Sequence, residues 1–219
     1  MKKSKYDALN FIFRLIRKTY RVFFSPPTQQ ELLERKQLSD YKYLIKHGVE
    51  TKLGYVTLFG EPLITKSPNS RIIMGNGVVI ISESKYNRAG INHPTIISTE
   101  ASGAEIIIAD GVGMSGASIV AVERIEIGKD TMLGANTNIY DTDFHCIDAD
   151  MRLNQKSILE AVHAPVVIGN RCWLASNVTV LKGASIGDNC VVGAMSLVCK
   201  NIPKNSIVAG VPAKIIKSI

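Results

Sequence analysis

The residues with the clearest chemical potential lie in the segment Asp141-Thr142-Asp143-Phe144-His145. Histidine changes its charge near neutral pH, so His145 could take a proton from a hydroxyl group as that group attacks an electrophile. Asp143 and Asp148 flank it, and either carboxylate could orient the imidazole and raise its basicity. We favour Asp143 for this role, with solvated loop acids as the alternative interpretation.

The other three histidines are weaker candidates for proton transfer. His47 follows a predicted helix, His93 precedes a proline, and His163 lies well downstream of His145. We interpret His93 as structural or as lining a site for an acceptor, and His163 as structural or substrate-contacting. Cys146 lies next to His145, and its thiol could act as a nucleophile that forms a covalent intermediate. Adjacent residues of a strand point to opposite sides, so we favour a reaction without a covalent intermediate on Cys146.

A repeat of six residues must position these groups. Aliphatic side chains recur at this spacing, and small or apolar ones follow each by four residues: Ile168, Leu174, Val180, Ile186, Val192 and Val198, then Cys172, Val178, Ala184, Cys190, Ser196 and Ile202. This period fits neither a helix nor a simple strand. It predicts a coil of three short segments per turn, with about 18 residues completing a turn.

The repeat predicts which residues stack in neighbouring turns, at the spacing of paired strands, about 4.8 Å. Ile168 should stack on Ile186, Leu174 on Val192, Val180 on Val198, and Cys172 on Cys190. Two cysteines are thereby interpreted as small core residues. None of the four cysteines forms a CxxC pair, so a zinc ribbon is not expected.

The same pattern recurs upstream, where an aliphatic residue precedes Gly or Ala and then usually a polar residue: Met74-Gly75-Asn76, Ile108-Ala109-Asp110, Ile127-Gly128-Lys129, Ile168-Gly169-Asn170 and Ile186-Gly187-Asp188. We expect Gly to tolerate the backbone of a corner, and Asn or Asp to tolerate left-handed turns. The phase slips by one residue between Val120 and Ile127. The repeat is lost at about 145–165, which predicts an extruded loop that carries function.

The sequence therefore divides into four parts. Residues 1–49 are expected to form two helices, 50–70 a lead-in segment, 71–203 the coil with its extruded loop, and 204–219 a C-terminal tail. The fold class is mainly β with an N-terminal helical appendage. At 219 residues the chain is long enough to bury a core without disulfides.

The net charge of +7 is concentrated at the N-terminus, where the first 24 residues carry seven basic side chains and one acid. Residues 5–24 fit a basic amphipathic helix, which could lie on a membrane surface or pack on protein; both interpretations stay open. The rest of the chain lacks the spread of cations that nucleic acid needs. No signal peptide or membrane span is expected, so we expect a cytoplasmic protein, with the inner face of the membrane as the alternative.

The repeat and its surrounding motifs resemble the hexapeptide-repeat acyltransferases, whose fold is a left-handed parallel β-helix. The resemblance covers about residues 70–217. Trp173 after a Gly-containing corner, the run 193–196 and the closing Gly210-x-Pro212-Ala213-Lys214 are similar to the maltose, galactoside and polysaccharide O-acetyltransferase branch. The segment 141–145 resembles the catalytic-histidine loop of that branch.

The resemblance implies an acetyl-CoA-dependent O-acetyltransferase that works as a homotrimer, with acetyl-CoA between coils of neighbouring subunits and no metal. It implies His145 as the general base, with Asp143 as its partner. It also implies donor contacts at Ala175, Ser176, Ala194, Cys199 and Lys200, and cations near the nucleotide phosphates at Lys214 and Lys217.

Three positions depart from the branch pattern. Cys146 stands where relatives often have Pro, Ala175 where they usually have Gly, and Met114-Ser115-Gly116 where they often have an Asn that helps to bind acceptor and donor. The role of that Asn is left open. A sugar or cell-surface saccharide hydroxyl is the expected acceptor, and an amino sugar or an antibiotic is the alternative. A zinc-dependent carbonic anhydrase and a non-catalytic coil are the less favoured interpretations of the same fold.

Overall fold

The computed structural model describes residues 28–219, so the predicted basic helix at 5–24 lies outside the described residues. The chain divides into two compact units, Met1–Lys36 and Gln37–Ile219. Helix α2 (Gln29–Lys46) matches the predicted second helix. It begins with a capping box, in which the Thr28 hydroxyl accepts the N–H of Glu31 and the Glu31 carboxylate accepts the N–H of Thr28.

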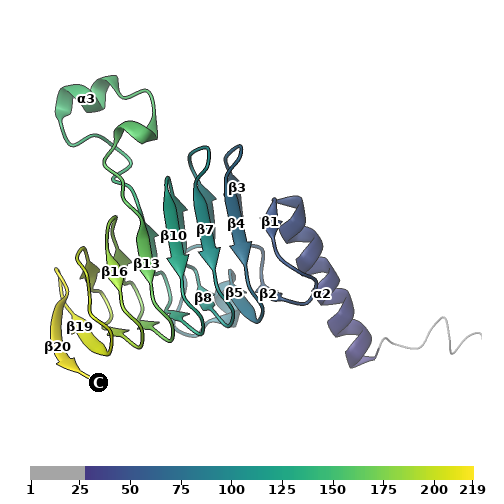
Figure 1. The fold of residues 1–219 in the computed structure, drawn as a ribbon. Helices are drawn as coiled ribbons and strands as arrows, with labels where there is room; N and C mark the ends of the chain where they lie inside the picture. The colour runs from purple at the N-terminus through teal and green to yellow at the C-terminus, as the bar shows by residue number, and fades with distance from the viewer. Residues whose placement is uncertain (1–27) are drawn as a thin grey trace, which may run out of the picture. The chain divides into compact units, whose positions relative to one another are not determined.

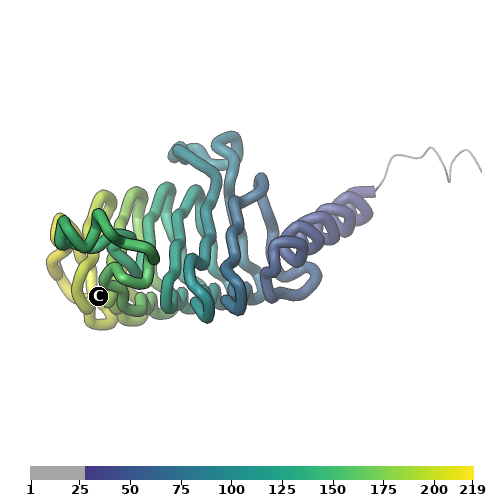
Figure 2. The backbone as a smooth tube through the Cα atoms, turned by 90° about the horizontal axis from the view of Figure 1, so that it is seen from above, coloured from purple at the N-terminus to yellow at the C-terminus, as the bar shows by residue number. Residues whose placement is uncertain are grey.

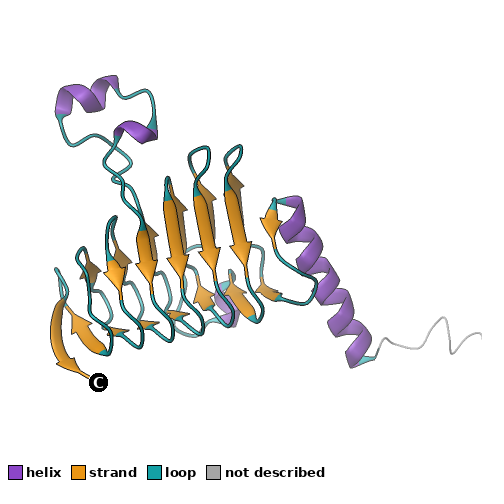
Figure 3. Cartoon of the chain, viewed as in Figure 1, coloured by secondary structure: helices purple, strands orange, loops and turns teal. Residues whose placement is uncertain are grey.

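The second unit is a coil whose turns pass through three sheets of short strands (Figures 1 and 3). The first sheet runs in the order β1 (Val49–Glu50), β4 (Arg71–Met74), β7 (Glu105–Ile108), β10 (Arg124–Ile127), β13 (Val166–Ile168) and β16 (Ser185–Ile186). Every neighbouring pair in it is parallel. The predicted coil is thus a parallel β-helix.

The other two sheets complete each turn. The second contains β2 (Val56–Phe59), β5 (Val78–Ile81), β8 (Gly113–Ser115), β11 (Met132–Leu133), β14 (Trp173–Leu174), β17 (Val191–Val192), β19 (Ser206–Ala209) and β20 (Lys214–Ser218). The third contains β3 (Leu63–Lys66), β6 (Ile96–Thr99), β9 (Ser118–Ala121), β12 (Asn138–Tyr140), β15 (Thr179–Val180) and β18 (Leu197–Val198). Only the last pair of the second sheet, β19 and β20, is antiparallel.

The predicted stacking holds where it was specified. Ile168 pairs with Ile186, Leu174 with Val192, and Val180 with Val198. All six side chains are buried and belong to one aliphatic core that runs along the inside of the coil. Cys172 and Cys190 are buried free thiols, and burial raises the pKa of the Cys172 thiol.

The coil extends beyond the predicted boundaries at both ends. Residues 50–70, expected as a lead-in, contribute β2 and β3, so with β1 they form the first turn. From Gln37 onward, α2 packs on this turn: the Asp40 carboxylate accepts the N–H of Leu58, and the Tyr43 hydroxyl donates to the carbonyl of Pro62. Residues 204–219, expected as a tail, add β19 and then β20.

A second insertion, which the repeat pattern did not indicate, separates β5 from β6 and contains a short helix, η1 (Ser84–Tyr86). Figure 2 shows it as a projection from the regular stack of turns. Asn136 holds it on the coil: its side chain accepts the N–H of Asn92 and donates to the carbonyl of Gly90. A Cβ on Gly116 would lie 2.8 Å from Ile91, so this glycine makes room for the insertion.

The predicted phase slip is present, and a second irregularity precedes it. Strand β9 places Ile119, rather than Val120, in the column with Ile97 and Ile139. Ile119 therefore follows the inward Met114 of the second sheet by five residues instead of six, and Ile127 follows Ile119 by eight. The short spacing coincides with the corner at Gly116, against which the second insertion packs.

The glycines directly after an inward aliphatic residue, Gly75, Gly128, Gly169 and Gly187, serve close packing rather than unusual backbone angles. A Cβ on Gly128 would lie 2.5 Å from the carbonyl carbon of Gly169 in the next turn, too close for any side chain. The left-handed conformation instead falls two residues later, for example at Asp130 (φ 56°) and Arg171 (φ 53°). The expected corner glycine is therefore present, but for a steric reason.

We predict that Gly128→Ala lowers the free energy of unfolding by roughly 1–3 kcal/mol, because the new methyl group must push two turns apart. Gly113→Ala is the matched control, since a Cβ there meets nothing within 4 Å. It should change stability by no more than about 0.5 kcal/mol. Urea unfolding of both variants measures the difference, and equal stabilities would contradict the steric explanation.

Candidate active site

The loop predicted at about 145–165 leaves the coil between β12 and β13 on a two-stranded stalk (Figure 1). Thr142 and His163 form an antiparallel bridge, with the N–H of Asp143 donating to Val162 at 3.0 Å and the N–H of Ala164 donating to Asp141 at 2.9 Å. Beyond the stalk the chain forms α3 (Ala149–Asn154) and η2 (Ile158–Glu160). His145 lies where the stalk ends.

The side chain of His145 is exposed on the wall of an open pocket of about 400 Å³. The other lining residues all come from the same loop: Phe144, Arg152, Gln155, Lys156, Ser157 and Ile158. The N–H of His145 donates to the carbonyl of Asp143 at 2.7 Å, which makes a tight turn at this point. An imidazole that faces a solvent-filled pocket can reach the hydroxyl of a bound molecule.

The two carboxylates near His145 have different partners. The Asp143 carboxylate is partly buried and pairs with the ammonium group of Lys182 at 2.5 Å. Asp148 caps α3, where its side chain accepts the N–H of Met151. Helix capping therefore accounts for Asp148, and the role of Asp143 towards the imidazole stays a prediction.

Asp141 has a structural role that the sequence did not indicate. Its side chain is fully buried at the root of the stalk and accepts the backbone N–H groups of Val122, Glu123 and Arg124, which form the corner of the preceding turn. Burial raises the pKa of the Asp141 carboxyl, and the three N–H donors oppose that rise. One carboxylate thus joins the turn before the loop to the loop itself.

The remaining histidines each have one ring nitrogen close to a backbone carbonyl. In His93 the partner is Pro94, in His163 it is Ala161, and in His47 it is Tyr43, at distances of 2.8–2.9 Å. If Nδ1 carries the proton in each, Nε2 is left as an acceptor. In each of the three histidines, this bond to the backbone fixes the orientation of the ring.

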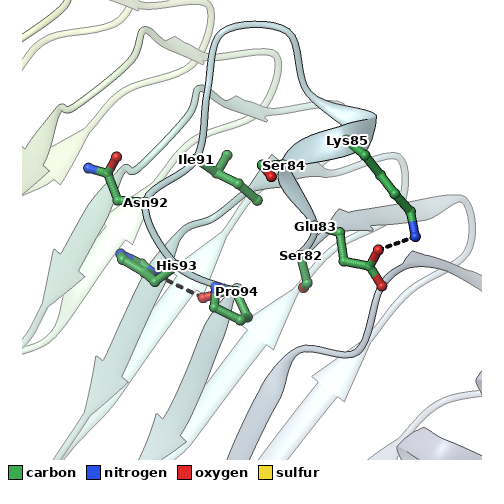
Figure 4. Close-up of a pocket in the computed structure, with 8 residues that line it drawn as sticks. All are labelled: Ser82, Glu83, Ser84, Lys85, Ile91, Asn92, His93 and Pro94. Carbon is green, nitrogen blue, oxygen red and sulfur yellow. Dashed lines mark hydrogen bonds and ion pairs between the residues drawn. The ribbon is translucent and has the colours of Figure 1, made fainter.

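His93 also lines a separate pocket of about 320 Å³ in the second insertion (Figure 4). One arm contributes residues 82–85 and the other contributes residues 91–94. Glu83 and Lys85 pair with each other there. The lining mixes hydroxyl, carboxylate, amide and imidazole groups with the apolar surfaces of Ile91 and Pro94, which suits a polar ligand.

The residues expected to contact the donor fall on two corners of the coil. Ser176 and Ala194 lie between the second and third sheets, with the N–H of Met195 donating to the carbonyl of Ser176. Cys199 and Lys200 follow β18, on the side of the coil from which the His145 loop leaves. One chain therefore does not gather these residues into a single pocket with His145.

Two neighbouring backbone N–H groups in this region differ in whether they are free to bind a ligand. The N–H of Ala175 donates to the carbonyl of Val192 within the ladder between turns, so it is not free to bind a ligand. The N–H of Ser176 has no such acceptor within residues 28–219. Lys214 and Lys217 are exposed on β20, the last strand of the second sheet.

Residues 28–219 contain no group of three or more His, Cys, Asp and Glu side chains that could hold a metal ion. Over the same residues, no helix is both long and apolar enough to cross a membrane.

The comparison with known families agrees with this architecture. The family model described as a bacterial transferase hexapeptide of six repeats matches residues 165–200, the most regular turns of the coil. Residues 165–200 of this chain thus match the hexapeptide-repeat pattern. This match and the parallel three-sheet coil confirm the predicted left-handed parallel β-helix and the resemblance to the hexapeptide-repeat acyltransferases.

Curated proteins similar to this chain carry acetyltransferase names. A putative lipopolysaccharide biosynthesis O-acetyl transferase of Escherichia coli K12 is 42% identical over 110 residues, which are 45% of this chain and 53% of that protein. The galactoside O-acetyltransferase of the same strain is 36% identical over 102 residues, or 47% and 48% of the two chains. The chain spans about half the length of these relatives.

A solved structure shows the same fold over most of the chain. It is a mutant of AntD, an N-acyltransferase from Bacillus cereus, in complex with dTDP-4-amino-4,6-dideoxyglucose and coenzyme A. The TM-score is 0.56 at 17% identity, with 81% of this chain and 88% of that chain covered. At this identity the likeness concerns the fold.

We predict that Asp141→Ala lowers the free energy of unfolding by roughly 2–4 kcal/mol, because three backbone N–H groups lose a buried acceptor. The matched control is Asp110→Ala, which removes an exposed carboxylate that also accepts a backbone N–H, from Asn76, and pairs with Lys129. Its cost should be clearly smaller, because solvent screens an exposed carboxylate. Thermal unfolding compares the two, and similar losses would contradict a special role for Asp141.

Proposed function

We propose that this protein is an acetyl-CoA-dependent O-acetyltransferase that acts on a hydroxyl of a sugar or of a cell-surface saccharide. The observation that carries the proposal is the position of His145. A coil with a regular repeat is interrupted by a loop on an ordered stalk, and the loop presents this one imidazole on the wall of a pocket. The names of the two relatives, which refer to lipopolysaccharide biosynthesis and to galactoside, support a saccharide acceptor.

The proposed reaction is a direct transfer. The imidazole of His145 removes the proton from an acceptor hydroxyl as its oxygen attacks the carbonyl carbon of the thioester. The tetrahedral intermediate then collapses with cleavage of the carbon–sulfur bond, and the imidazolium returns its proton to the departing sulfur of coenzyme A. The Asp143 carboxylate pairs with Lys182, and the carbonyl of Asp143 accepts the N–H of His145. We propose that this carboxylate orients the imidazole.

The intermediate carries a negative oxygen that needs hydrogen-bond donors. We assign this role to the N–H of Ser176 rather than to that of Ala175, because the latter is already bonded to Val192. Cys146 remains outside the reaction. Its thiol is buried and donates to the carbonyl of Glu160, so it faces into the loop and away from the exposed imidazole.

The donor site is proposed to lie between copies of the chain, in a homotrimer. The split of the expected donor residues between two corners supports this, since a second copy could bring one corner to the His145 loop of the first. A row of outward apolar side chains also crosses the second sheet, where Met132, Trp173, Val191 and Ile207 pair in register. Met132 and Trp173 are 56% and 50% exposed, which suits a surface that a partner covers.

The other expected donor contacts fit an extended ligand. Ala175, Ser176 and Ala194 offer small side chains and backbone to a pantetheine arm, and Cys199 and Lys200 continue along the last turns. Lys214 and Lys217 supply exposed cations for the nucleotide phosphates. Use of acetyl-CoA is consistent with a cytoplasmic location, and contact of residues 5–24 with the inner face of the membrane stays a proposal.

We predict that His145→Ala lowers kcat by about 10²–10⁴-fold, because the attacking hydroxyl loses its proton acceptor. Transfer of acetyl groups from radiolabelled acetyl-CoA to a panel of saccharides and amino sugars measures the loss and identifies the acceptor. Calorimetric titration should show unchanged acetyl-CoA affinity.

His47→Ala is the control for this experiment, since His47 lies at the end of α2 and bonds only to its own turn. It should retain normal turnover. Near-normal turnover of His145→Ala would rule out the assigned base, and transfer to amino groups only would favour N-acetylation of an amino sugar.

A further inference from the structure

One side-chain amide holds both peptide groups that flank His145. The Gln155 carbonyl oxygen accepts the N–H of Cys146 at 2.8 Å, and the Gln155 amide nitrogen donates to the carbonyl of Phe144 at 2.9 Å. These two peptide groups adjoin the Cα of His145 on either side. The two bonds therefore restrict the backbone angles that set the direction of the imidazole.

Phe144, the residue before His145, has an uncommon backbone conformation. Its φ of 61° lies in the left-handed region, which is unfavourable for a residue other than glycine. Such a conformation persists only where the surroundings hold it. Three contacts hold Phe144. Its N–H donates to the Thr142 hydroxyl, and its carbonyl accepts from the Gln155 amide. Its ring meets the Tyr140 ring edge-on, with the two ring centroids 5.2 Å apart.

The rest of the loop explains how Gln155 reaches this place. Helix α3 turns the chain back after Asp148, and Gln155 is the residue that ends it. Gln155 also donates to the carbonyl of Ser157, which anchors its amide to the return arm. Arg152 from the same helix donates to the carbonyls of Cys146 and Ile147, and so holds the chain beyond His145 rather than beside it.

We propose that Gln155 is a positioning residue, whose amide fixes the backbone on both sides of His145 and thereby aims the imidazole into the pocket that both residues line. The proposal rests on the proposed function in that His145 is taken as the general base. On this account the extruded loop has a specific task, which is to return Gln155 to the start of the loop.

The first test is kinetic. Gln155→Ala should lower kcat roughly 10–100-fold, because a displaced base loses much of its advantage of position. The KM for acetyl-CoA and its calorimetric Kd should stay within about twofold, since no donor contact changes. Gln155→Glu keeps an acceptor for the N–H of Cys146 and loses the donor to Phe144, so its kcat should fall between those of wild type and Gln155→Ala.

Asn154→Ala is the matched control. Asn154 precedes Gln155, and its side chain donates only to the carbonyl of Asp150 within α3. This variant should keep wild-type kcat. A loss equal to that of Gln155→Ala would mean that general loosening of the loop, and not the amide clamp, causes the effect, and it would overturn the proposal.

The second test needs no acceptor. Amide hydrogen exchange, resolved to single residues, should be at least about tenfold faster at Cys146 in Gln155→Ala, while amides of the coil are unchanged. Unchanged exchange at Cys146 would overturn the clamp. Faster exchange with normal kcat would overturn its role in positioning. If His145→Ala retains turnover, the proposed function fails, and the exchange result still decides whether the clamp exists.

Discussion

The vertical stacking of aliphatic side chains, one turn of the coil on the next, is the constraint on which the rest of this structure depends. Each inward residue contacts the equivalent residues above and below it, and the backbone of each turn is bonded to its neighbours. A strand within the stack cannot lengthen without breaking this register. Extra chain can leave only at corners, and both insertions, at 82–95 and 141–165, begin and end there.

The site is built from local exceptions to this regularity. Asp141 buries a carboxylate at a corner, where three backbone N–H groups surround it. Phe144 adopts a left-handed conformation that is rare for an aromatic residue. Each exception costs free energy by itself and is offset by defined partners. Together they place His145 on a hydrogen-bonded stalk, which suits the defined geometry that proton transfer requires.

The parts of the fold that repeat could be predicted from sequence, because stacking imposes one residue type at one spacing. The columns through Ile168, Leu174 and Val180, the position of the loop and the candidate base His145 follow from it. The first turn was missed because its strands lie in a segment where the six-residue spacing is diluted by longer corners. The second insertion could not be predicted because the repeat resumes at Ile96, so only a short stretch of sequence departs from the pattern.

The contacts that shape the site have no such signature. Gln155 and Asp141 bind backbone groups that only the folded loop brings near them, and a side chain bonded to backbone imposes no residue type on its partner. Gly128 was expected to allow the backbone angles of a corner, but it is required because a side chain would clash with the next turn. The sequence of one turn does not reveal how closely the next turn packs on it. The donor residues remain predictions, since they would meet His145 only across a boundary between copies.

The most direct test of the central claim is a crystal structure of the protein with coenzyme A. The account predicts a trimer in which the ligand lies between two copies, with its sulfur within hydrogen-bond distance of a His145 imidazole nitrogen and its phosphates near Lys214 or Lys217. Coenzyme A bound away from every copy of His145, or within a single isolated chain, would contradict the account.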